Sequence, residues 1–403
     1  MNKKDIQQFI KKSIISRDKS LFYNDIENNK TKLINNIKNK SVLVIGGAGT
    51  IGSSFIKEIL KFKPNKLVVV DTNENGLTEL TRDLRSQYGQ YIPKSYYSYP
   101  MNFGDKVFIK MFSNHGPFNI VANFAAHKHV RSEKDIYSIE AMIDNNVLKA
   151  KRFLDLLVKS KPDHFFCVST DKAANPVNIM GVSKKIMEEV IMSYSKDIKI
   201  STARFANVAF SNGSLLDGFI ERINKNQPIS CPNDVKRFFV SPEESGQICM
   251  LSCILGNSSD IFFPKLKIDE LVNFKDIADR FFKFIDKKIV LCNSENEAKK
   301  LSNNSKGDDR FPVYYFKSDT SGEKLYEEFF TNKDTLDLDS YNSLGVIKNT
   351  DIKSNDYITN LISDLEKLFN SRTYNKKSLI ILLKKYVKDF EHIETGKNLD
   401  QKM

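Results

Sequence analysis

A glycine-rich turn between two apolar runs constrains the fold of this chain more than any other feature. Residues 41–45 read Ser-Val-Leu-Val-Ile, typical of a buried strand, and Gly-Gly-Ala-Gly-Thr-Ile-Gly follows at 46–52. A second apolar run at 67–70 ends at Asp71. Strand, glycine turn, helix, strand and acid in this order form the fingerprint of a dinucleotide-binding unit. The sequence therefore predicts a βαβ unit of that kind.

The chemistry of this turn predicts contacts to a cofactor. Glycine lets the backbone approach a pyrophosphate, and the positive N-terminus of the next helix stabilises that charge. The carboxylate of Asp71 is expected to bond the ribose 2′-hydroxyl. No Arg follows it closely to hold a 2′-phosphate, so NAD is favoured over NADP. The predicted contacts in the turn are Gly46, Gly49, Thr50, Ile51 and Gly52.

Strands and helices alternate through the next hundred residues. Strands are predicted at 95–99, 119–123 and 165–168, and a long helix is predicted at about 138–159. This alternation predicts an α/β fold with a doubly wound parallel Rossmann sheet. Further cofactor contacts are expected after the third and fourth strands. They are Asn102, Phe103, Ala125 and Ala126.

A polar triplet, Thr170-Asp171-Lys172, follows the fifth predicted strand. The carboxyl ends of parallel strands border the crevice in which α/β proteins bind ligands. A carboxylate beside an amine offers an acid and a base whose pKa values the site can separate. The helix that opens near Met180 carries Lys184 one turn further on. We therefore predict that this stretch carries the chemistry.

The second half of the chain supplies candidate ligands for an anionic substrate. A sixth strand is predicted at 199–208, followed by a turn at 210–214 with exposed backbone donors. Cationic side chains of this region are suited to phosphates. The formal charge of +12 favours an anionic ligand such as a nucleotide diphosphate. The predicted substrate contacts are Lys128, His129, Asn207, Gly213, Ser214, Arg237, Lys265 and Glu323.

Several classes of site and partner are not expected. The lysines are spread along the chain without an Arg-rich or aromatic-interleaved patch, so nucleic acid is not a predicted partner. His127 and His129 lack a third ligand motif, so no metal is predicted. The five cysteines show no Cys-x-x-Cys spacing and are predicted to be reduced core residues. No run of 18 apolar residues and no signal-peptide pattern is found, so a cytoplasmic protein without a membrane span is predicted.

Changes in composition and in hydrophobic spacing along the chain suggest four regions. A basic leader carries apolar residues at helical spacing, and two amphipathic helices are expected at the other end. Between them lie the Rossmann part and a smaller α/β region for the substrate. The predicted bounds are 1–40 for the leader, 41–206 for the NAD-binding domain with a core extending into 240–265, 207–345 for the substrate region and 346–403 for the helical extension.

Motifs distributed over residues 41–329 carry a family resemblance. They are Gly-Gly-Ala-Gly-Thr-Ile-Gly52, Ala-Ala-His-Lys-His-Val130, Ser-Thr-Asp-Lys172, Arg-Phe-Ala-Asn-Val208, Lys-Arg-Phe-Phe239, Ile-Phe-Phe-Pro-Lys265 and Ser-Gly-Glu-Lys324. Together they resemble the extended short-chain dehydrogenase/reductase family, and within it the nucleotide-sugar 4,6-dehydratases. The branch most resembled is the UDP-N-acetylglucosamine 4,6-dehydratases of bacterial surface-sugar synthesis. Some stretches are similar to legionaminic-acid pathway members.

Two positions depart from the wider family's pattern. That family carries Tyr-x-x-x-Lys, with the tyrosine as the base for alcohol oxidation, whereas this chain has Met180-x-x-x-Lys184. Methionine cannot take a proton, and by resemblance it marks the 4,6-dehydratases that retain configuration at C5. The arginine usual two residues before Gly-Glu-Lys is Thr320 here.

The resemblance implies a redox-neutral lyase acting on UDP- or GDP-N-acetylglucosamine. Oxidation at C4 by NAD acidifies C5–H, Lys172 removes that proton, and Asp171 protonates the departing C6 hydroxyl before hydride returns to C6. Thr170 would bond the C4 oxygen and Lys184 the nicotinamide ribose. The 4-keto-6-deoxy product would serve surface polysaccharide or nonulosonic acid synthesis. A homo-oligomer is also implied, through the helices from about residues 138 and 178.

Two alternatives remain open. The first is a 4-epimerase or 4-ketoreductase of the same fold, which needs no acid–base pair for C5 and C6 and usually keeps the tyrosine. The mass of the product separates it, because only a dehydratase product is lighter by one water. The second is an inactive NAD-binding regulator or nucleic-acid partner, suggested by the basic composition and the missing tyrosine. Salt-dependent binding of nucleic acid would favour it.

Overall fold

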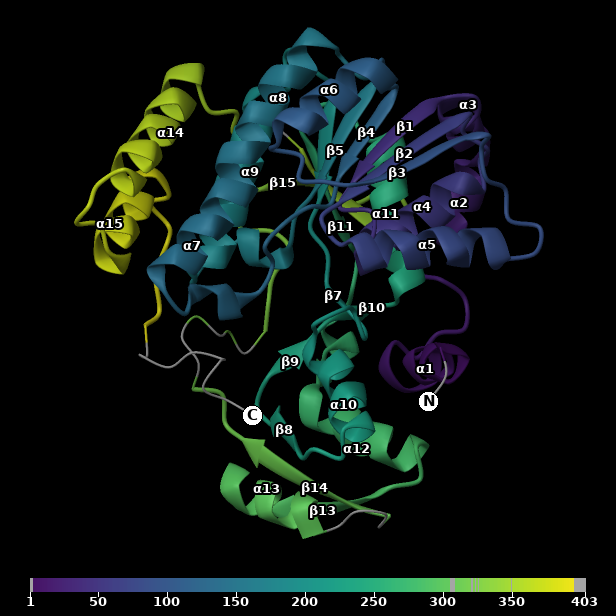
Figure 1. The fold of residues 1–403 in the computed structure, drawn as a ribbon, viewed down its shortest axis with the longest axis vertical. Helices are drawn as coiled ribbons and strands as arrows, with labels where there is room; N and C mark the ends of the chain where they lie inside the picture. Colours follow the sequence, from purple (N-terminus) through teal and green to yellow (C-terminus); the bar gives the residue numbers. More distant parts are fainter. Residues whose placement is uncertain are drawn as a thin grey trace.

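The computed structural model describes the chain in six stretches, and Glu323, a predicted substrate contact, lies outside them together with Thr320. A large sheet flanked by helices forms most of the molecule, and a smaller α/β part lies at one end of it (Figure 1). The described residues are 3–304, 309–319, 322, 324, 326–348 and 350–394.

Nine strands form the large sheet within the described residues. They are β1 (Ser41–Ile45), β2 (Lys66–Asp71), β3 (Ser95–Pro100), β4 (Ile120–Asn123), β5 (His164–Val168), β6 (Ile200–Ala203), β11 (Asp260–Pro264), β15 (Thr335–Asp337) and β16 (Leu344–Lys348). Their order is β3-β2-β1-β4-β5-β6-β11-β16-β15, and the pairs are parallel except β11–β16 and β16–β15, which are antiparallel. The strands β1 to β3 are added toward one edge of the sheet, and β4 and the strands after it toward the other. This switch in strand order opens a crevice at the carboxyl ends of β1 and β4. The predicted α/β Rossmann sheet is confirmed.

Helices cover both faces of this sheet (Figure 1). Each helix packs on the sheet through an apolar face, and in the helix at Thr50–Leu60 the side chains of Phe55, Ile56 and Ile59 are all fully buried. The predicted long helix is present and contains a π-helical stretch at Asp144–Leu148. On one face lie α4 (Thr50–Leu60), α5 (Glu74–Ser86) and α11 (Pro242–Leu255), and on the other α6 (Lys106–His115), α7 (Ile136–Ile143), α8 (Lys149–Lys159) and α9 (Ile179–Ser193).

The predicted sixth strand ends earlier than expected, at Ala203. Arg204 follows, and its buried guanidinium pairs with Glu188 on α9. The chain then leaves the sheet and forms β7 (Asn207–Val208), which pairs with β10 (Phe239–Val240) in a separate sheet. The chain thus leaves the large sheet at a buried charge and enters the smaller part.

The smaller part has its own sheet and core. Its parallel sheet has the order β13-β14-β8. Phe219, Phe281 and Phe282 are almost fully buried in a second hydrophobic cluster. Its elements are β8 (Ile229–Pro232), β9 (Lys236–Arg237), β12 (Val272–Asn273), β13 (Lys288–Cys292), β14 (Arg310–Phe316), α10 (Leu215–Asn224), α12 (Phe274–Phe284) and α13 (Glu295–Asn304).

The N-terminal leader connects the two parts. Helix α1 (Lys3–Phe9) buries Phe9 in the core of the smaller part. Arg17 then donates from Nε and Nη2 to the carboxylate of Glu244, at 2.7 and 3.0 Å, in the first turn of α11. The helices α2 (Tyr23–Asn28) and α3 (Lys30–Ile37) follow, and they lie with the large sheet rather than with the smaller part (Figure 1).

The end of the chain returns to the large part. The predicted boundary at residue 345 falls inside β16, which lies in the large sheet. The amphipathic helices expected after it are α14 (Asn355–Phe369) and α15 (Lys376–Tyr386), and they lie outside α9 (Figure 1). Every residue of α9 except Lys185 is buried. The outer side of a helix predicted to carry an oligomer interface is therefore covered by the chain itself.

Other predicted features can be placed in the described part of the chain. All five cysteines are free and buried, as predicted. None of the described helices combines the length and apolar character that crossing a bilayer requires. Among the described residues, no group of three His, Cys, Asp or Glu side chains is arranged to hold a metal ion.

Candidate active site

The glycine turn after β1 is shaped by close backbone contacts. Gly46 has a φ of +76°, and a Cβ there would lie 2.5 Å from the backbone nitrogen of Ala125. A Cβ on Gly52 would lie 2.3 Å from the carbonyl oxygen of Gly46. At Gly49 the nearest atom would be 3.6 Å away, so that side of the turn is open. No side chain caps α4, and an anion can therefore approach its N-terminus over Gly49.

Asp71 closes the turn from the end of β2. Its carboxylate accepts hydrogen bonds from the backbone nitrogens of Ala48 and Asn73, both at 2.9 Å. A carboxylate has further lone pairs beyond these two, which suit ribose hydroxyls. An open helix N-terminus and an acid at the next strand end fit a dinucleotide.

The remaining predicted cofactor contacts differ in the burial and polarity of their side chains. Asn102 accepts a hydrogen bond from the backbone of Gly104 at 2.9 Å in an exposed turn after β3. Phe103 is buried against Phe153, so its ring belongs to the core. Ala125 and Ala126 follow β4 and are half-buried. Of this set, only Asn102 offers a polar side chain.

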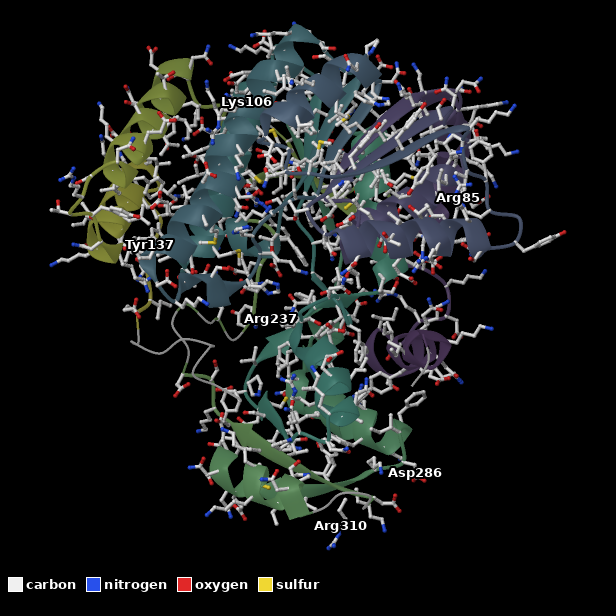
Figure 2. The ribbon with its side chains drawn as sticks, viewed as in Figure 1. Arg85, Lys106, Tyr137, Arg237, Asp286 and Arg310 are labelled. Carbon is white, nitrogen blue, oxygen red and sulfur yellow. The ribbon has the colours of Figure 1, made fainter. Side chains whose placement is uncertain are left out.

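A cavity of about 640 Å³ lies at the carboxyl ends of the strands, beside the smaller part. This volume is in the range of small-molecule sites. Figure 2 shows Arg237 between the two parts of the molecule. The predicted site residues that line the cavity are Ile51, Ala126, Lys128, His129, Thr170, Lys172, Met180, Lys184, Asn207, Gly213, Ser214 and Arg237.

The polar triplet forms one bonded group, in which Thr170 and Lys172 line the cavity and Asp171 is buried beside them without lining it. Thr170 Oγ1 donates to Asp171 Oδ1 at 2.7 Å, and Lys172 Nζ donates to the same oxygen at 3.1 Å. Glu327, which the sequence did not reveal, lies 3.5 Å from Lys172 Nζ. Arg237 Nη2 lies 3.9 Å from the same carboxylate oxygen of Glu327. Two carboxylates and two cations thus meet beside the cavity.

Burial and charge act in opposite directions on this group. Burial by itself would lower the pKa of Lys172, but the carboxylates of Asp171 and Glu327 outweigh it and raise that pKa. Burial raises the pKa of Glu327, although Lys172 opposes the shift. Lys172 is consequently an ammonium here, and it must lose a proton before it can act as a base.

The first turn of α9 is fixed from three directions. Asn178 caps the helix by accepting from the Gly181 nitrogen at 2.7 Å, and its Nδ2 donates to the Gly322 carbonyl at 2.9 Å. Glu133 accepts from the Met180 nitrogen at 2.9 Å. One turn on, Lys184 Nζ donates to the Val168 carbonyl at 3.0 Å, and burial lowers its pKa.

A buried ion pair lies behind the triplet. Arg204 donates from Nε and Nη2 to the carboxylate of Glu188 at 2.9 and 2.7 Å, and both side chains are 2% exposed. Ser169 Oγ donates to Glu188 at 2.6 Å. Arg204 Nη1 donates to the Phe329 carbonyl at 3.0 Å. The pair therefore joins β5, β6 and α9 to the stretch that carries Glu327.

The predicted substrate contacts of the loops are partly brought together. Lys128 Nζ donates to the Asn212 carbonyl at 3.3 Å, and the Asn212 nitrogen donates to Thr50 Oγ1 at 3.0 Å. A Cβ on Gly213 would lie 3.3 Å from the ring of His129. Lys265 lies elsewhere, because its Nζ donates to the carbonyls of two residues outside the cavity. Both of these distances, to Leu338 and Tyr341, are 2.5 Å.

Comparison with known proteins finds relatives along most of this chain. The family model described as "Polysaccharide biosynthesis protein" matches residues 42–349. The capsular polysaccharide biosynthesis protein CapD of Staphylococcus aureus is 27% identical over 74% of this chain and 48% of its own length. The chain thus spans about half the length of that relative.

Two further relatives are named as nucleotide-sugar enzymes. The UDP-N-acetylglucosamine 4,6-dehydratase (inverting) of Campylobacter jejuni is 26% identical over 58% of this chain and 69% of its own. The UDP-glucose 4-epimerase of Rickettsia rickettsii is 29% identical over 56% of this chain and 66% of its own. The X-ray structure of Pen from Bacillus thuringiensis has a TM-score of 0.62 at 21% identity, covering 77% of this chain and 87% of that one. That likeness supports the fold.

Proposed function

Because this chain belongs to the family of polysaccharide biosynthesis proteins, we propose that it is an NAD-dependent nucleotide-sugar 4,6-dehydratase. The substrate class is UDP- or GDP-N-acetylglucosamine, and the product is the 4-keto-6-deoxy sugar used for surface polysaccharide or nonulosonic acid synthesis. One observation carries the proposal. Lys172 lines the cavity and is bonded to the buried Asp171, beside a helix start that has Met180 in place of a tyrosine. An epimerase has no use for such a pair at C5 and C6.

The cofactor is assigned to the glycine turn. Gly49 leaves room before the N-terminus of α4, and Asp71 presents a carboxylate at the end of β2. NAD, when bound, supplies the acceptor and later the donor of a hydride. Ile51, which follows the turn, and Ala126, which follows β4, line the same cavity as Thr170 and Lys172.

The chain's own groups move the protons. We assign removal of the C5 proton to Lys172 and protonation of the departing C6 hydroxyl to Asp171. Thr170 connects the C4 oxygen to Asp171, since its hydroxyl donates to that carboxylate. The C4 proton can therefore pass to Asp171 and leave with the C6 oxygen as water. Positioned acid–base groups of this kind contribute about 10²–10⁴-fold to rate.

The direct test is incubation of the purified protein with UDP- and GDP-N-acetylglucosamine and NAD, with product analysis by mass spectrometry and NMR. A product lighter by one water, with a ketone at C4 and a methyl group at C6, is expected. A product of unchanged mass with inverted C4 would identify an epimerase instead. Binding of NAD without turnover of either sugar would contradict both assignments.

The two glycines at the start of α4 give the first mutational prediction. Gly52→Ala should lower the melting temperature, because its Cβ must displace the Gly46 carbonyl, and overpacking of this kind costs about 1–3 kcal/mol. Gly49→Ala should keep the melting temperature and weaken NAD binding, because its Cβ occupies the open side of the turn. Scanning fluorimetry and NAD titration measure the two effects. Equal losses of stability in both variants would contradict the placement of NAD.

Met180 gives the second prediction. Met180→Tyr should yield little gain or a loss of turnover, because the residue is 2% exposed and the added phenol must compete for space beside the triplet. Met180→Leu, which keeps the volume, should stay active. A large gain from tyrosine, with a nearly inactive natural protein, would show that a tyrosinate is needed after all.

A further inference from the structure

We propose that Glu327 is the internal proton acceptor that frees Lys172 to act as a base. The inference rests on the proposed function and adds a residue that the family motifs did not assign. It starts from the protonation of Lys172. Lys172 is held as an ammonium by Asp171 and Glu327, at 3.1 and 3.5 Å, so the group that must accept the C5 proton already carries one.

Geometry favours Glu327 over Asp171 as the acceptor. Asp171 Oδ1 already receives hydrogen bonds from Thr170 and Lys172, and this carboxylate is needed for the proton that travels from the C4 oxygen to the C6 oxygen. Neither Asp171, at 4% exposed, nor Glu327, at 5%, lines the cavity, and what separates them is their neighbours. Asp171 is bonded to Thr170, which lines the cavity, whereas Glu327 faces the cations Lys172 and Arg237. Each carboxylate would then carry one proton, without competition between them.

The position of Glu327 is fixed from both sides along the chain. Asn178 bonds the Gly322 carbonyl, and Arg204 bonds the Phe329 carbonyl. Asn175 Nδ2 donates to the neighbouring Glu328 at 2.8 Å. This many anchors on a short stretch hold its buried carboxylate within reach of Lys172.

The charges around Glu327 indicate what triggers the transfer. Burial raises its pKa, as does Asp171, while Lys172, Arg237 and Lys324 lower it. A diphosphate bound by Arg237 would neutralise one of these cations and close the cavity to water. Both changes favour the neutral carboxylic acid. Binding of the substrate is therefore what moves the proton from Lys172 Nζ to Glu327.

The protons balance over the cycle. Glu327 takes one proton from Lys172, and the neutral amine takes the C5 proton. Lys172 returns a proton to C5 when hydride reaches C6, and Glu327 returns its own proton to Lys172 after the product leaves. The C4 proton leaves through Asp171 with the water. No outside acid, base or oxidant is required.

The pH dependence of Glu327→Gln tests this assignment. The amide keeps the shape but accepts no proton, so Lys172 must then lose its proton to solvent. At neutral pH kcat should fall about 10²-fold with KM nearly unchanged, and it should rise about tenfold per pH unit toward the lysine pKa. The wild type, which transfers the proton internally, should show a flat profile over the same range. A role in structure alone would lower the rate equally at every pH.

Two further variants complete the experiment. Glu328→Gln is the matched control, since that side chain is adjacent but exposed, and its amide oxygen can still accept the hydrogen bond from Asn175, so it should behave as wild type. Glu327→Asp retains an acceptor and should keep the flat profile at a reduced rate, which also covers a glutamine variant that does not fold. Unchanged turnover in Glu327→Gln, a loss independent of pH, or a steep profile in Glu327→Asp would overturn the inference. A wild type that binds NAD but dehydrates neither sugar would overturn the proposed function, and this inference with it.

Discussion

Lys172→Ala is expected to lower kcat by about 10²–10⁴-fold while nucleotide-sugar binding is retained. The amine is the group assigned to the C5 proton, and its side chain is only 18% exposed beside two carboxylates. Turnover by mass spectrometry and affinity by calorimetry measure the two quantities separately. The same variant should stop exchange of the C5 proton with deuterated solvent.

Lys172→Arg separates basicity from charge. Arginine keeps a cation beside Asp171 and Glu327, so the ion pairs and the fold should survive, but it does not release a proton at neutral pH. We expect it to be as inactive as the alanine variant. Lys128→Ala, at another residue that lines the cavity, should instead raise KM. Substantial turnover in Lys172→Arg would mean that the cation, rather than the base, matters.

Arg204→Ala should be the most destabilising of the substitutions considered. It leaves the carboxylate of Glu188 buried without its cation, and breaking a buried pair in this way costs about 3–5 kcal/mol. It also removes the bond to the Phe329 carbonyl, so activity should fall in the protein that remains folded. Denaturant titration followed by fluorescence measures the change in the free energy of unfolding.

The double variant Arg204→Met with Glu188→Met is the control for this effect. Replacing both charges by apolar side chains avoids the unpaired carboxylate, so much of the stability should return. Although burial alone would raise the pKa of Glu188, Arg204 outweighs it and the pKa is lowered. The pair therefore stabilises the fold above the usual carboxyl pKa of 4.5 and loses its effect as the pH falls through the lowered value. Equal stability of wild type and Arg204→Ala at neutral pH would contradict this account.

The sequence was most informative where the relevant contacts are local. The turn at Gly46, Gly49 and Gly52 lies between two strands close in sequence, and Asp71 bonds to Ala48 only 23 residues away. The triplet was predictable because a buried strand ends at Val168, two residues before Thr170. In these places, short-range patterns are enough to place a side chain.

Contacts between distant segments could not be predicted in this way. Arg204 and Phe329 are 125 residues apart, and nothing in an Arg-Phe-Ala-Asn-Val run shows that its guanidinium is buried. Glu327 is one acid among many until the fold brings it to Lys172. The opposite error occurred at Lys265, whose charge suggested a phosphate contact but whose amine bonds two backbone carbonyls. Such pairings are decided by the tertiary structure.

The C-terminal helices show that the limit of a family and the limit of a folding unit can differ. The family match ends at residue 349, yet Leu361, Leu365 and Leu383 beyond it are fully buried in the main core. Tyr357 donates to the Tyr386 carbonyl at 2.8 Å, so the two helices also brace each other. A protein truncated at residue 349 would expose the apolar outer side of α9 and would be expected to aggregate. For this chain, the buried surface marks the end of the folding unit better than the end of the family match does.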